Sequence, residues 1–212
     1  LQFIPANCHQ FFELGPRFRR KVVDWGLFHV EQSFQHHWKL FSKVLKQRNA
    51  CLRNQEQEEH VAYWTEQFCI ASAKLNEFRR SYTEQLRAEL NNWLEILLPD
   101  VSTDIEIQYY RGWNQKKELV LVLNEAKGRE LKQGYSQAGA HKFDFRFLID
   151  KQPLDLKLSR GQQKLFLFAL TFAQSKLMKR VTPVKPILVI DDVGAELDDK
   201  SRTLLAKSID KL

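Results

Sequence analysis

The feature of this 212-residue sequence that most limits its fold is a regular apolar stripe between residues 64 and 97. Apolar residues recur there at steps of four and three, with one additional step of four after Tyr82. This is the spacing of a heptad seam with a four-residue insertion. Residues 34–52 show matching spacing, and the polar stretch 54–60 favours a reversal. The sequence therefore predicts two helices that pair as an antiparallel arm. Such a stripe is more often plain helix core than a partner site, so it predicts no function.

Residues 103–150 change from helical spacing to the two-residue alternation of strands. Residues 105–109 and 143–149 alternate apolar with polar side chains, and residues 119–123 form an apolar run. These segments predict three strands, with turns at 111–114 and 150–153. Residues 155–180 return to a helical pattern. The most economical topology is an α/β fold in which a helical arm is inserted into a mixed sheet.

Residues 158–162, Leu-Ser-Arg-Gly-Gln, precede an apolar helix. Ser159 is a good N-cap, and Gly161 allows backbone to approach a ligand closely. A helix start of this kind can bind a phosphate. Taken alone, a Ser-x-Gly segment is usually only a helix cap.

A second motif begins 26 residues after Gln162. The apolar run 187–190 suits a buried parallel strand, which would place Asp191 and Asp192 at its C-terminal edge. Asp191 can hold Mg²⁺, and Asp192 can orient or deprotonate the water that attacks a γ-phosphate. Paired acids at a strand end are usually solvated turn residues. The order of capped helix, apolar strand, paired Asp and Glu196-Leu197-Asp198 at the next helix start favours an ATP-handling apparatus.

This order resembles the C-terminal half of an ABC-type ATPase head, with a signature motif, a Walker B strand and a D-loop. The paired Asp is similar to that of the RecF family rather than to transporters. The segments Gly15–Arg20, Asp24–Gly26, Leu45–Asn49 and His141-Lys142 with Asp144 extend the resemblance to nearly the whole chain. The chain departs from the family at Ala140, where Pro is usual, and in the linker 193–195.

The resemblance implies three parts: a head segment at 1–14, a helical arm at 15–98, and strands with the signature helix and Walker B at 99–212. It implies ATP and Mg²⁺ as cofactors. The nucleotide-binding residues would be Ser159, Arg160, Gly161 and Gln162; the catalytic residues Asp191 and Asp192, with Asp191 as the Mg²⁺ ligand; and the D-loop Glu196, Leu197 and Asp198. Gln2 is a candidate Q-loop glutamine or simply a polar strand-end residue.

No Gly-x-x-x-x-Gly-Lys-Ser/Thr phosphate loop occurs in the 212 residues, although the family needs one. The sequence begins at Leu1 and has its only methionine at position 178. We therefore expect an internal fragment that lacks the Walker A strands and the final strands with the switch His. Such a fragment would not hydrolyse ATP alone.

The chain carries a formal net charge of +7 and a pI near 9.3, which favours polyanions but is often only a solubility device. Residues 34–53 hold five basic residues and no acidic one, with three lysines at steps of four and three. Such a stripe suits duplex phosphates, and a solvated helix face is the even alternative. A second cluster of basic residues precedes Asp24 and consists of Arg17, Arg19, Arg20 and Lys21. These residues would either bind DNA or form internal ion pairs with Asp24. The DNA-binding candidates are Lys39, Lys43, Lys46, Arg48, Arg17, Arg19 and Arg20.

The apolar segments and the cysteines narrow the classes of protein to which this sequence can belong. No apolar stretch approaches the 18 residues that would span a bilayer. Cys8, Cys51 and Cys69 have neither C-x-x-C spacing nor an even count, which favours incidental thiols in a reducing compartment.

The resemblance implies an ATP-dependent, DNA-binding recombination mediator that acts in DNA repair and replication as a slow, DNA-linked ATPase. It implies a homodimer around ATP, double-stranded and gapped DNA, and RecR as partners, with RecO and RecA in the same pathway, in the cytoplasm at the nucleoid. Another SMC-like repair ATPase head shares the motifs but would normally have a longer coiled coil. A non-catalytic DNA-binding scaffold with a decayed ATPase site is the contrasting alternative.

Overall fold

In a computed structural model of the chain, the described residues are 2–4, 10–13, 15–182, 187–194 and 196–210. They divide into two compact units, and the chain passes between them four times. Unit 1 comprises Leu1–Val30, Tyr82–Gln108 and Phe145–Leu212, and unit 2 comprises Glu31–Ser81 and Tyr109–Asp144. The predicted arm, 15–98, is thus shared between both units, and residues 109–144 join its middle part in unit 2.

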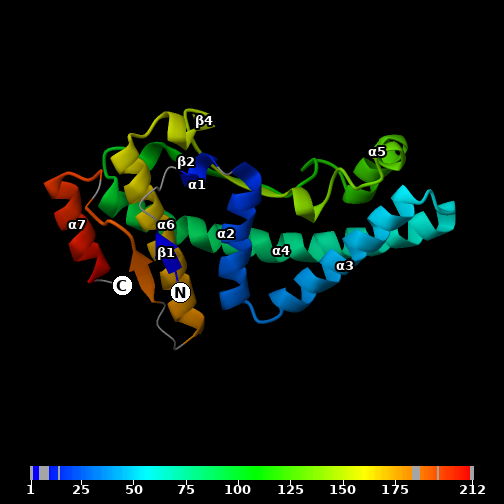
Figure 1. Ribbon diagram of the computed structural model, residues 1–212, viewed down its shortest axis with the longest axis horizontal. Coiled ribbons are helices and arrows are strands. Elements are labelled where there is room, and N and C mark those ends of the chain that lie inside the picture. The colour runs from blue at the N-terminus through cyan, green and yellow to red at the C-terminus, as the bar shows by residue number, and fades with distance from the viewer. Residues whose placement is uncertain (1, 5–9, 14, 183–186, 195, 211–212) are drawn as a thin grey trace. The chain divides into compact units, whose positions relative to one another are not determined.

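Unit 2 consists mainly of helices, among them α3 (Phe34–Arg53) and α5 (Leu119–Gln133), which Figure 1 draws in cyan and green. A three-residue 3₁₀ helix, η2, precedes the strand that leaves the unit. The other helical elements are the first part of α4 (Glu58–Leu97) and η2 (Ala140–Lys142).

The helices α3 and α4 run antiparallel within unit 2, as the sequence predicts. Near the start of α3 the Phe34 ring lies 5.9 Å from that of Phe78. Two turns further on, the Phe41 ring lies 5.5 Å from that of Phe68. The partner number falls as the α3 number rises, which is the register of an antiparallel pair. The reversal occupies residues 54–57, inside the predicted polar stretch.

The prediction of a strand at 119–123 is wrong, because these residues open the helix α5. Buried residues of α5 recur at 119, 123, 126 and 130, which is a helical spacing. A short apolar run does not distinguish strand from helix, and here most of the residues that follow, 124–133, are Glu, Lys, Arg, Gln, Ala and Leu, which have high helix propensity. Gly134, with φ of 73°, ends the helix in the left-handed conformation that glycine adopts at little cost.

Unit 1 surrounds α6 (Arg160–Val181), which is buried on nearly every side from Gln163 to Met178. Phe166, Phe168 and Phe172 of this helix are fully buried. Packing is tight: a Cβ on Gly26 of α2 would lie 1.9 Å from the Tyr82 hydroxyl oxygen. The other elements of the unit are α1 (Gln10–Glu13), α2 (Gly15–Val30), the second part of α4, the 3₁₀ helices η1 (Ser102–Asp104) and η3 (Leu154–Leu156), and α7 (Asp199–Ile209).

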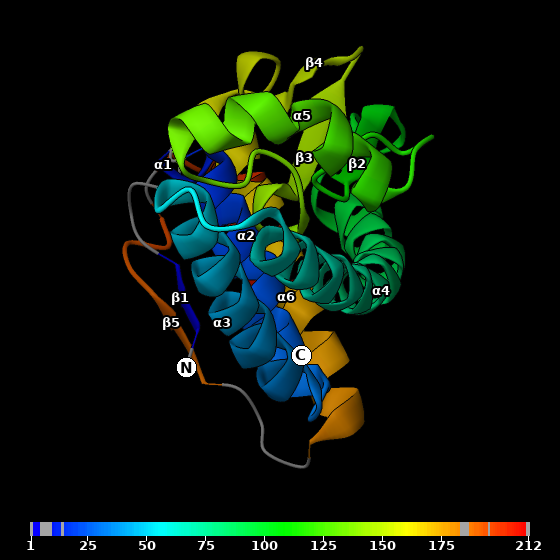
Figure 2. The ribbon, with the colours of Figure 1, turned by 90° about the vertical axis from the view of Figure 1, so that its right-hand side faces the viewer.

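The described strands form two small sheets. In one, β1 (Gln2–Ile4) pairs in parallel with β5 (Leu188–Ile190), and the two lie side by side in Figure 2. In the other, the order is β2 (Ile105–Tyr110), β3 (Asp144–Ile149) and β4 (Gln152–Pro153). The predicted turn at 150–153 is confirmed only for its first half: Asp150 and Lys151 both have positive φ and form a two-residue hairpin turn, whereas Gln152 and Pro153 form β4.

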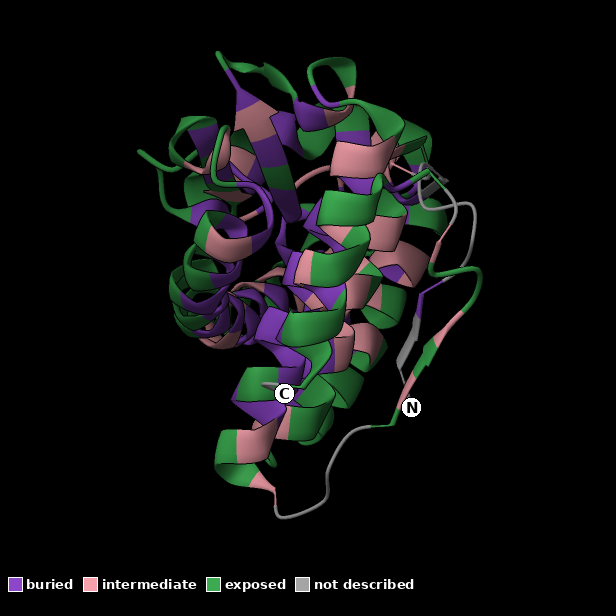
Figure 3. Ribbon diagram, turned by 90° about the vertical axis from the view of Figure 1, so that its left-hand side faces the viewer, coloured by how far each residue is buried: buried purple, intermediate pink, exposed green. Residues whose placement is uncertain are grey.

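The strand β5 is parallel, as predicted, but the expectation that it is buried is wrong for this chain. Val189 is exposed, and Figure 3 shows only exposed and intermediate residues along this strand. The reason is its neighbourhood, since β1 is its only strand partner among the described residues. The helix-rich α/β architecture itself agrees with the predicted fold class.

Candidate nucleotide site and basic helix

The first turn of α6 is closed by a capping box. The Gln162 backbone N–H donates to Ser159 Oγ at 3.3 Å, and the Ser159 N–H donates to Gln162 Oε1 at 2.9 Å. This reciprocal pairing follows directly from a Ser and a Gln three residues apart. Ser159 and Arg160 remain exposed, so the start of this 22-residue helix is open to a ligand. Backbone N–H groups and the helix dipole make such an end suitable for a phosphate.

The paired carboxylates lie directly after β5. The Asp191 N–H donates to the Ile4 carbonyl at 3.0 Å, which continues the parallel pairing by one residue. Asp192 then takes a left-handed conformation, with φ of 47°. Both aspartates are exposed. The strand pair therefore fixes the backbone of Asp191, whereas Asp192 needs a separate restraint.

That restraint comes from α6. Lys164, in the second turn of the helix, is fully buried, and its Nζ donates to the Asp192 carbonyl oxygen at 2.6 Å. The signature helix and the loop that carries the paired acids are thus attached to each other within one chain. From the sequence, Lys164 is one of two basic residues in the block 157–185, with Arg160, that could serve the nucleotide rather than DNA; its contact with the Asp192 carbonyl has no local signal in the sequence.

The predicted D-loop also meets the first turn of α6. A Cβ on Gly161 would lie 2.5 Å from the Glu196 carbonyl oxygen, so only glycine fits here without displacement. Leu197 is buried, and Asp198 is the N-cap of α7, accepting from the Ser201 N–H at 2.7 Å. That backbone hydrogen bond lowers the pKa of Asp198. The structure therefore brings together the two motifs that the sequence separates.

The carboxylate oxygens at this junction suit a Mg²⁺ ion that takes most of its ligands from phosphates and water rather than from the protein. Within the described ranges no cluster of three or more His, Cys, Asp or Glu side chains could enclose a metal. Mg²⁺ in nucleotide sites usually takes one or two protein carboxylates and completes its shell with phosphates and water. A single exposed carboxylate at Asp191 fits that role. Gln2 lies in β1 opposite Leu188, and its assignment as a Q-loop residue stays a prediction.

The basic stripe of α3 is exposed at Lys39, Lys43 and Lys46. Within the described part of the chain, none of these three lysines forms an ion pair. They recur at steps of four and three, so they share one side of the helix. Their predicted contact with DNA stays a prediction.

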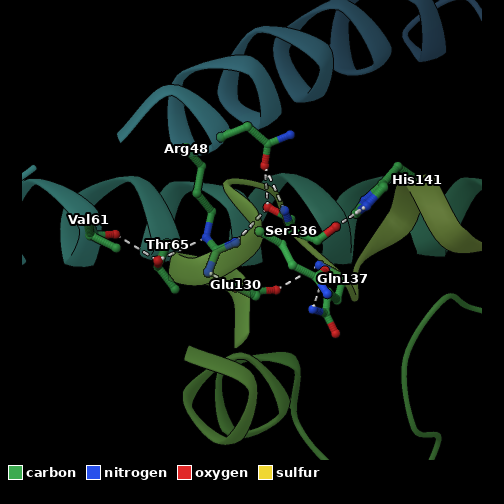
Figure 4. A network of polar contacts seen from close by, with 9 residues as sticks. Arg48, Val61, Thr65, Glu130, Ser136, Gln137 and His141 are labelled. Atoms are coloured by element: carbon green, nitrogen blue, oxygen red, sulfur yellow. Dashed lines mark hydrogen bonds and ion pairs between the residues drawn. The ribbon is translucent and has the colours of Figure 1, made fainter. Parts of the chain in front are cut away.

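Arg48 departs from this stripe, and the prediction that it contacts DNA needs correction. Its side chain is 3% exposed, and Figure 4 shows it enclosed in a polar network. Nη2 donates to Glu130 Oε2 and Nη1 to Ser136 Oγ, both at 2.6 Å, and Nε donates to Thr65 Oγ1 at 3.0 Å. Each guanidinium nitrogen is occupied inside unit 2, so Arg48 presents no charge to a ligand.

The arginines of α2 differ from one another. Arg17 is exposed, whereas Arg19 and Arg20 are half-buried and are not free cations. DNA binding by these three residues stays a prediction.

The cysteines offer no bridge among the described residues. Cys51 and Cys69 are free thiols, and Cys8 lies outside the described ranges. Burial raises the pKa of the Cys69 thiol to about 11, so it is protonated and unreactive at neutral pH. Across the described residues, no helix has the length and apolarity that crossing a membrane requires.

Comparison with known proteins gives a consistent result. No family model matches the chain. A protein of Colwellia psychrerythraea named DNA replication and repair protein RecF is 49% identical over 209 residues, 99% of this chain and 55% of that protein. Proteins of the same name from Pseudomonas syringae and Shewanella denitrificans are 37% and 36% identical, over 100% and 97% of this chain and 58% and 56% of theirs.

Solved structures give the same fold. A structure described as the recombination mediator protein RecF with ATP, in the RecFOR pathway, superimposes with a TM-score of 0.84 at 23% identity. It covers 97% of this chain and 58% of the solved chain. The chain thus spans a little over half the length of the proteins it matches. Over nearly its whole length, it is homologous to part of the RecF proteins.

Proposed function

We propose that the full-length gene product is an ATP-dependent, DNA-binding recombination mediator of the RecF type. The observation that carries this proposal is the junction in unit 1, where the capped start of α6 and the loop after β5 are joined. A decayed ATPase site, as in a scaffold protein, has no reason to retain an open helix cap and two exposed aspartates at one junction. Homology to proteins named for DNA replication and repair supports the biological role.

In this proposal the residues of the junction divide the work on ATP. The Ser159 hydroxyl accepts from the Gln162 N–H and keeps its own hydrogen to donate to a phosphate oxygen. Asp191 holds Mg²⁺, which neutralises phosphate charge. Asp192 orients the attacking water or removes its proton. The phosphate loop that cradles the β- and γ-phosphates has no counterpart in these 212 residues, so we expect negligible turnover by this chain alone.

We propose further that the two motifs act across a dimer. The signature turn of one subunit closes over the ATP that its partner holds, while Asp191 and Asp192 act on the ATP of their own subunit. Neither site is then complete in a monomer.

A mixed-dimer experiment tests this shared site in the full-length protein. One variant, Ser159→Arg, places bulk and charge where the γ-phosphate docks, and the other, Asp192→Asn, removes the carboxylate that faces the water. Each homodimer should be nearly inactive. Random 1:1 mixing makes half of the dimers hybrid, each with one intact site of two, so turnover should recover to roughly a quarter of wild type. No recovery, despite demonstrated subunit exchange and ATP-dependent dimerisation, would contradict the shared site.

DNA enters the proposal through the exposed lysines of α3. Their evenly spaced positive charges suit phosphates of double-stranded or gapped DNA, and they need no base-specific geometry. By the same homology, we propose that the protein works with RecR, in a pathway with RecO and RecA, on DNA in the cytoplasm at the nucleoid. Co-purification with purified RecR on gapped and on blunt DNA would measure the first of these partnerships.

A further inference from the structure

Lys164 is a buried cation that packing alone does not explain. Its side chain is fully buried in the second turn of α6. Moving an ammonium group out of water is unfavourable unless the group gains strong partners. An unbranched apolar side chain such as Met would fill similar space without that cost. The charge therefore has a role in what its Nζ binds.

The atom that Nζ binds belongs to the residue proposed to direct water. Lys164 donates to the Asp192 carbonyl oxygen at 2.6 Å, and a charged donor makes a stronger hydrogen bond than a neutral one. Asp192 has φ of 47°, a left-handed conformation that aspartate adopts more readily than most residues but that is still less favourable than for glycine, so a contact that holds the backbone there stabilises it. The hydrogen bond from Lys164 supplies such a contact at the peptide that follows Asp192.

Other contacts hold the loop on either side of Asp192. The strand pair holds Asp191, Arg202 Nη2 donates to the Gly194 carbonyl at 2.8 Å, and Glu196 packs against the first turn of α6. Lys164 connects α6 to Asp192 itself.

We infer that Lys164 is a positioning residue: it couples the position of the Asp192 carboxylate to the position of the first turn of α6. The inference rests on the proposed function. If the signature turn closes over the ATP of the partner subunit while Asp192 acts on the ATP of its own, Lys164 joins the two sites of a dimer through one chain. Closure of one site then sets the geometry of the other.

The first test is Lys164→Met in the full-length protein, with Lys176→Met as the matched control. Lys176 is exposed and lies on the same helix. We expect kcat to fall about 10²-fold in Lys164→Met, since misplacing a reacting group by about 1 Å has an effect of this size. The affinity of Lys164→Met for ATP should stay within about twofold of wild type, and so should the kcat of the control, Lys176→Met. Equal kcat for both variants would overturn the inference.

A general loss of stability is separated from positioning by Lys164→Arg. The guanidinium keeps a charged donor that can reach the same carbonyl. At matched melting temperature, Lys164→Arg should retain more kcat than Lys164→Met. If the Met variant does not fold, the Arg variant is compared with Lys164→Gln at a temperature where both are folded. Activity that follows melting temperature alone would reduce Lys164 to a packing residue.

The second test uses the mixed dimers of Ser159→Arg and Asp192→Asn. In the hybrid, the working Asp192 is on the Ser159→Arg subunit. Adding Lys164→Met to that subunit should abolish the recovered turnover, because it displaces the working carboxylate. Adding it to the Asp192→Asn subunit should leave most of the recovery.

Equal loss in both arrangements would overturn the positioning role, because Lys164 would then be supporting α6 as a whole. If the parent mixture shows no recovery, the shared-site proposal fails. The inference is then decided by kcat of Lys164→Met against Lys176→Met. If wild type has no ATP turnover, the proposed function and the inference both fail.

Discussion

Units 1 and 2 each bury a basic side chain, and they use it differently. In unit 1, Lys164 gives its ammonium to a loop carbonyl beside an exposed carboxylate, so the buried charge serves a site open to solvent. In unit 2, Arg48 gives its donors to Glu130, Ser136 and Thr65, and thereby ties α3, α4 and α5 to one another. The first cation binds the backbone of a loop, where we propose that it positions a reactive group, and the second replaces apolar core between helices. The role of a basic residue in a basic stretch of sequence therefore cannot be assigned until its neighbours in the fold are known.

The largest effect on stability is expected at Arg48. Replacing it by Met leaves the Glu130 carboxylate, which is fully buried, without its cation. Breaking a buried pair in this way should lower the free energy of unfolding by about 3–5 kcal/mol. Urea-induced unfolding measures the change, and Lys43→Met, an exposed lysine on the same helix, should change it by less than about 0.5 kcal/mol.

A double variant sharpens this prediction. Arg48→Met combined with Glu130→Leu removes both charges, and it should recover much of the loss because no unpaired charge remains. The assignment of Arg48 as a structural residue would be wrong if Arg48→Met weakened DNA binding with no change in unfolding.

The exposed face of α3 should affect binding rather than stability. Changing Lys39, Lys43 and Lys46 together to Ala should weaken duplex binding alike for all sequences. The slope of log affinity against log salt should become shallower by about 2–3, since roughly 0.9 counterion is released per phosphate contact. Fluorescence anisotropy over a salt series measures both quantities.

The control for this experiment removes the same charge from unit 1. Three exposed lysines on α6 and α7 are suitable: Lys176, Lys200 and Lys207. An equal loss of slope in both triple variants would indicate only non-specific attraction by net charge, and the stripe would be a solvated helix face.

In unit 1, backbone contact rather than charge limits substitution at Gly161. Its Ala variant places a Cβ 2.5 Å from the Glu196 carbonyl oxygen, and such overpacking should cost about 1–3 kcal/mol. In Gly194→Ala the nearest atom, Arg202 Nε, is 3.7 Å from the new Cβ, which is ordinary contact. Calorimetry should therefore show a lower melting temperature for Gly161→Ala than for Gly194→Ala. The reverse order would contradict the close packing of the D-loop on α6.

The smallest effect concerns pH. The Ser201 N–H lowers the pKa of Asp198, so this cap stabilises the protein above the unfolded pKa and loses its effect as pH falls through the folded pKa. With an ordinary Asp pKa of about 3.9, the loss belongs below about pH 4. In Asp198→Asn, which keeps a good cap without titrating, the difference in melting temperature between pH 7 and pH 3 should be smaller. If the difference in melting temperature between pH 7 and pH 3 were the same in Asp198→Asn as in wild type, Asp198 would not contribute to the loss of stability in acid.

How much the sequence predicts depends on how far apart the interacting residues are. The Ser159–Gln162 cap and the α3–α4 reversal were predictable because their signals lie within a few residues. The Arg48–Glu130 pair joins residues 82 positions apart, and no local pattern distinguishes it from an exposed basic residue.

Two other features were not predicted from the sequence for the same reason: each depends on a contact between residues that are not neighbours in the sequence. The apolar run that opens α5 was assigned to a strand because five residues fit either structure, and packing against α3 decides between them. Lys164 lies between the two recognised motifs and 28 residues from Asp192. Its role became visible only when the fold brought α6 and the loop together.

Single-turnover ATP hydrolysis by the Asp192→Asn form of the full-length protein tests the central claim most directly. In the proposed mechanism, ground-state binding would use the phosphate contacts and Asp191, whereas Asp192 would act on the water. The account therefore predicts that the variant binds ATP and dimerises as wild type does, but cleaves it at least about 10²-fold more slowly. Cleavage at the wild-type rate would show that the loop after β5 does not perform the chemistry.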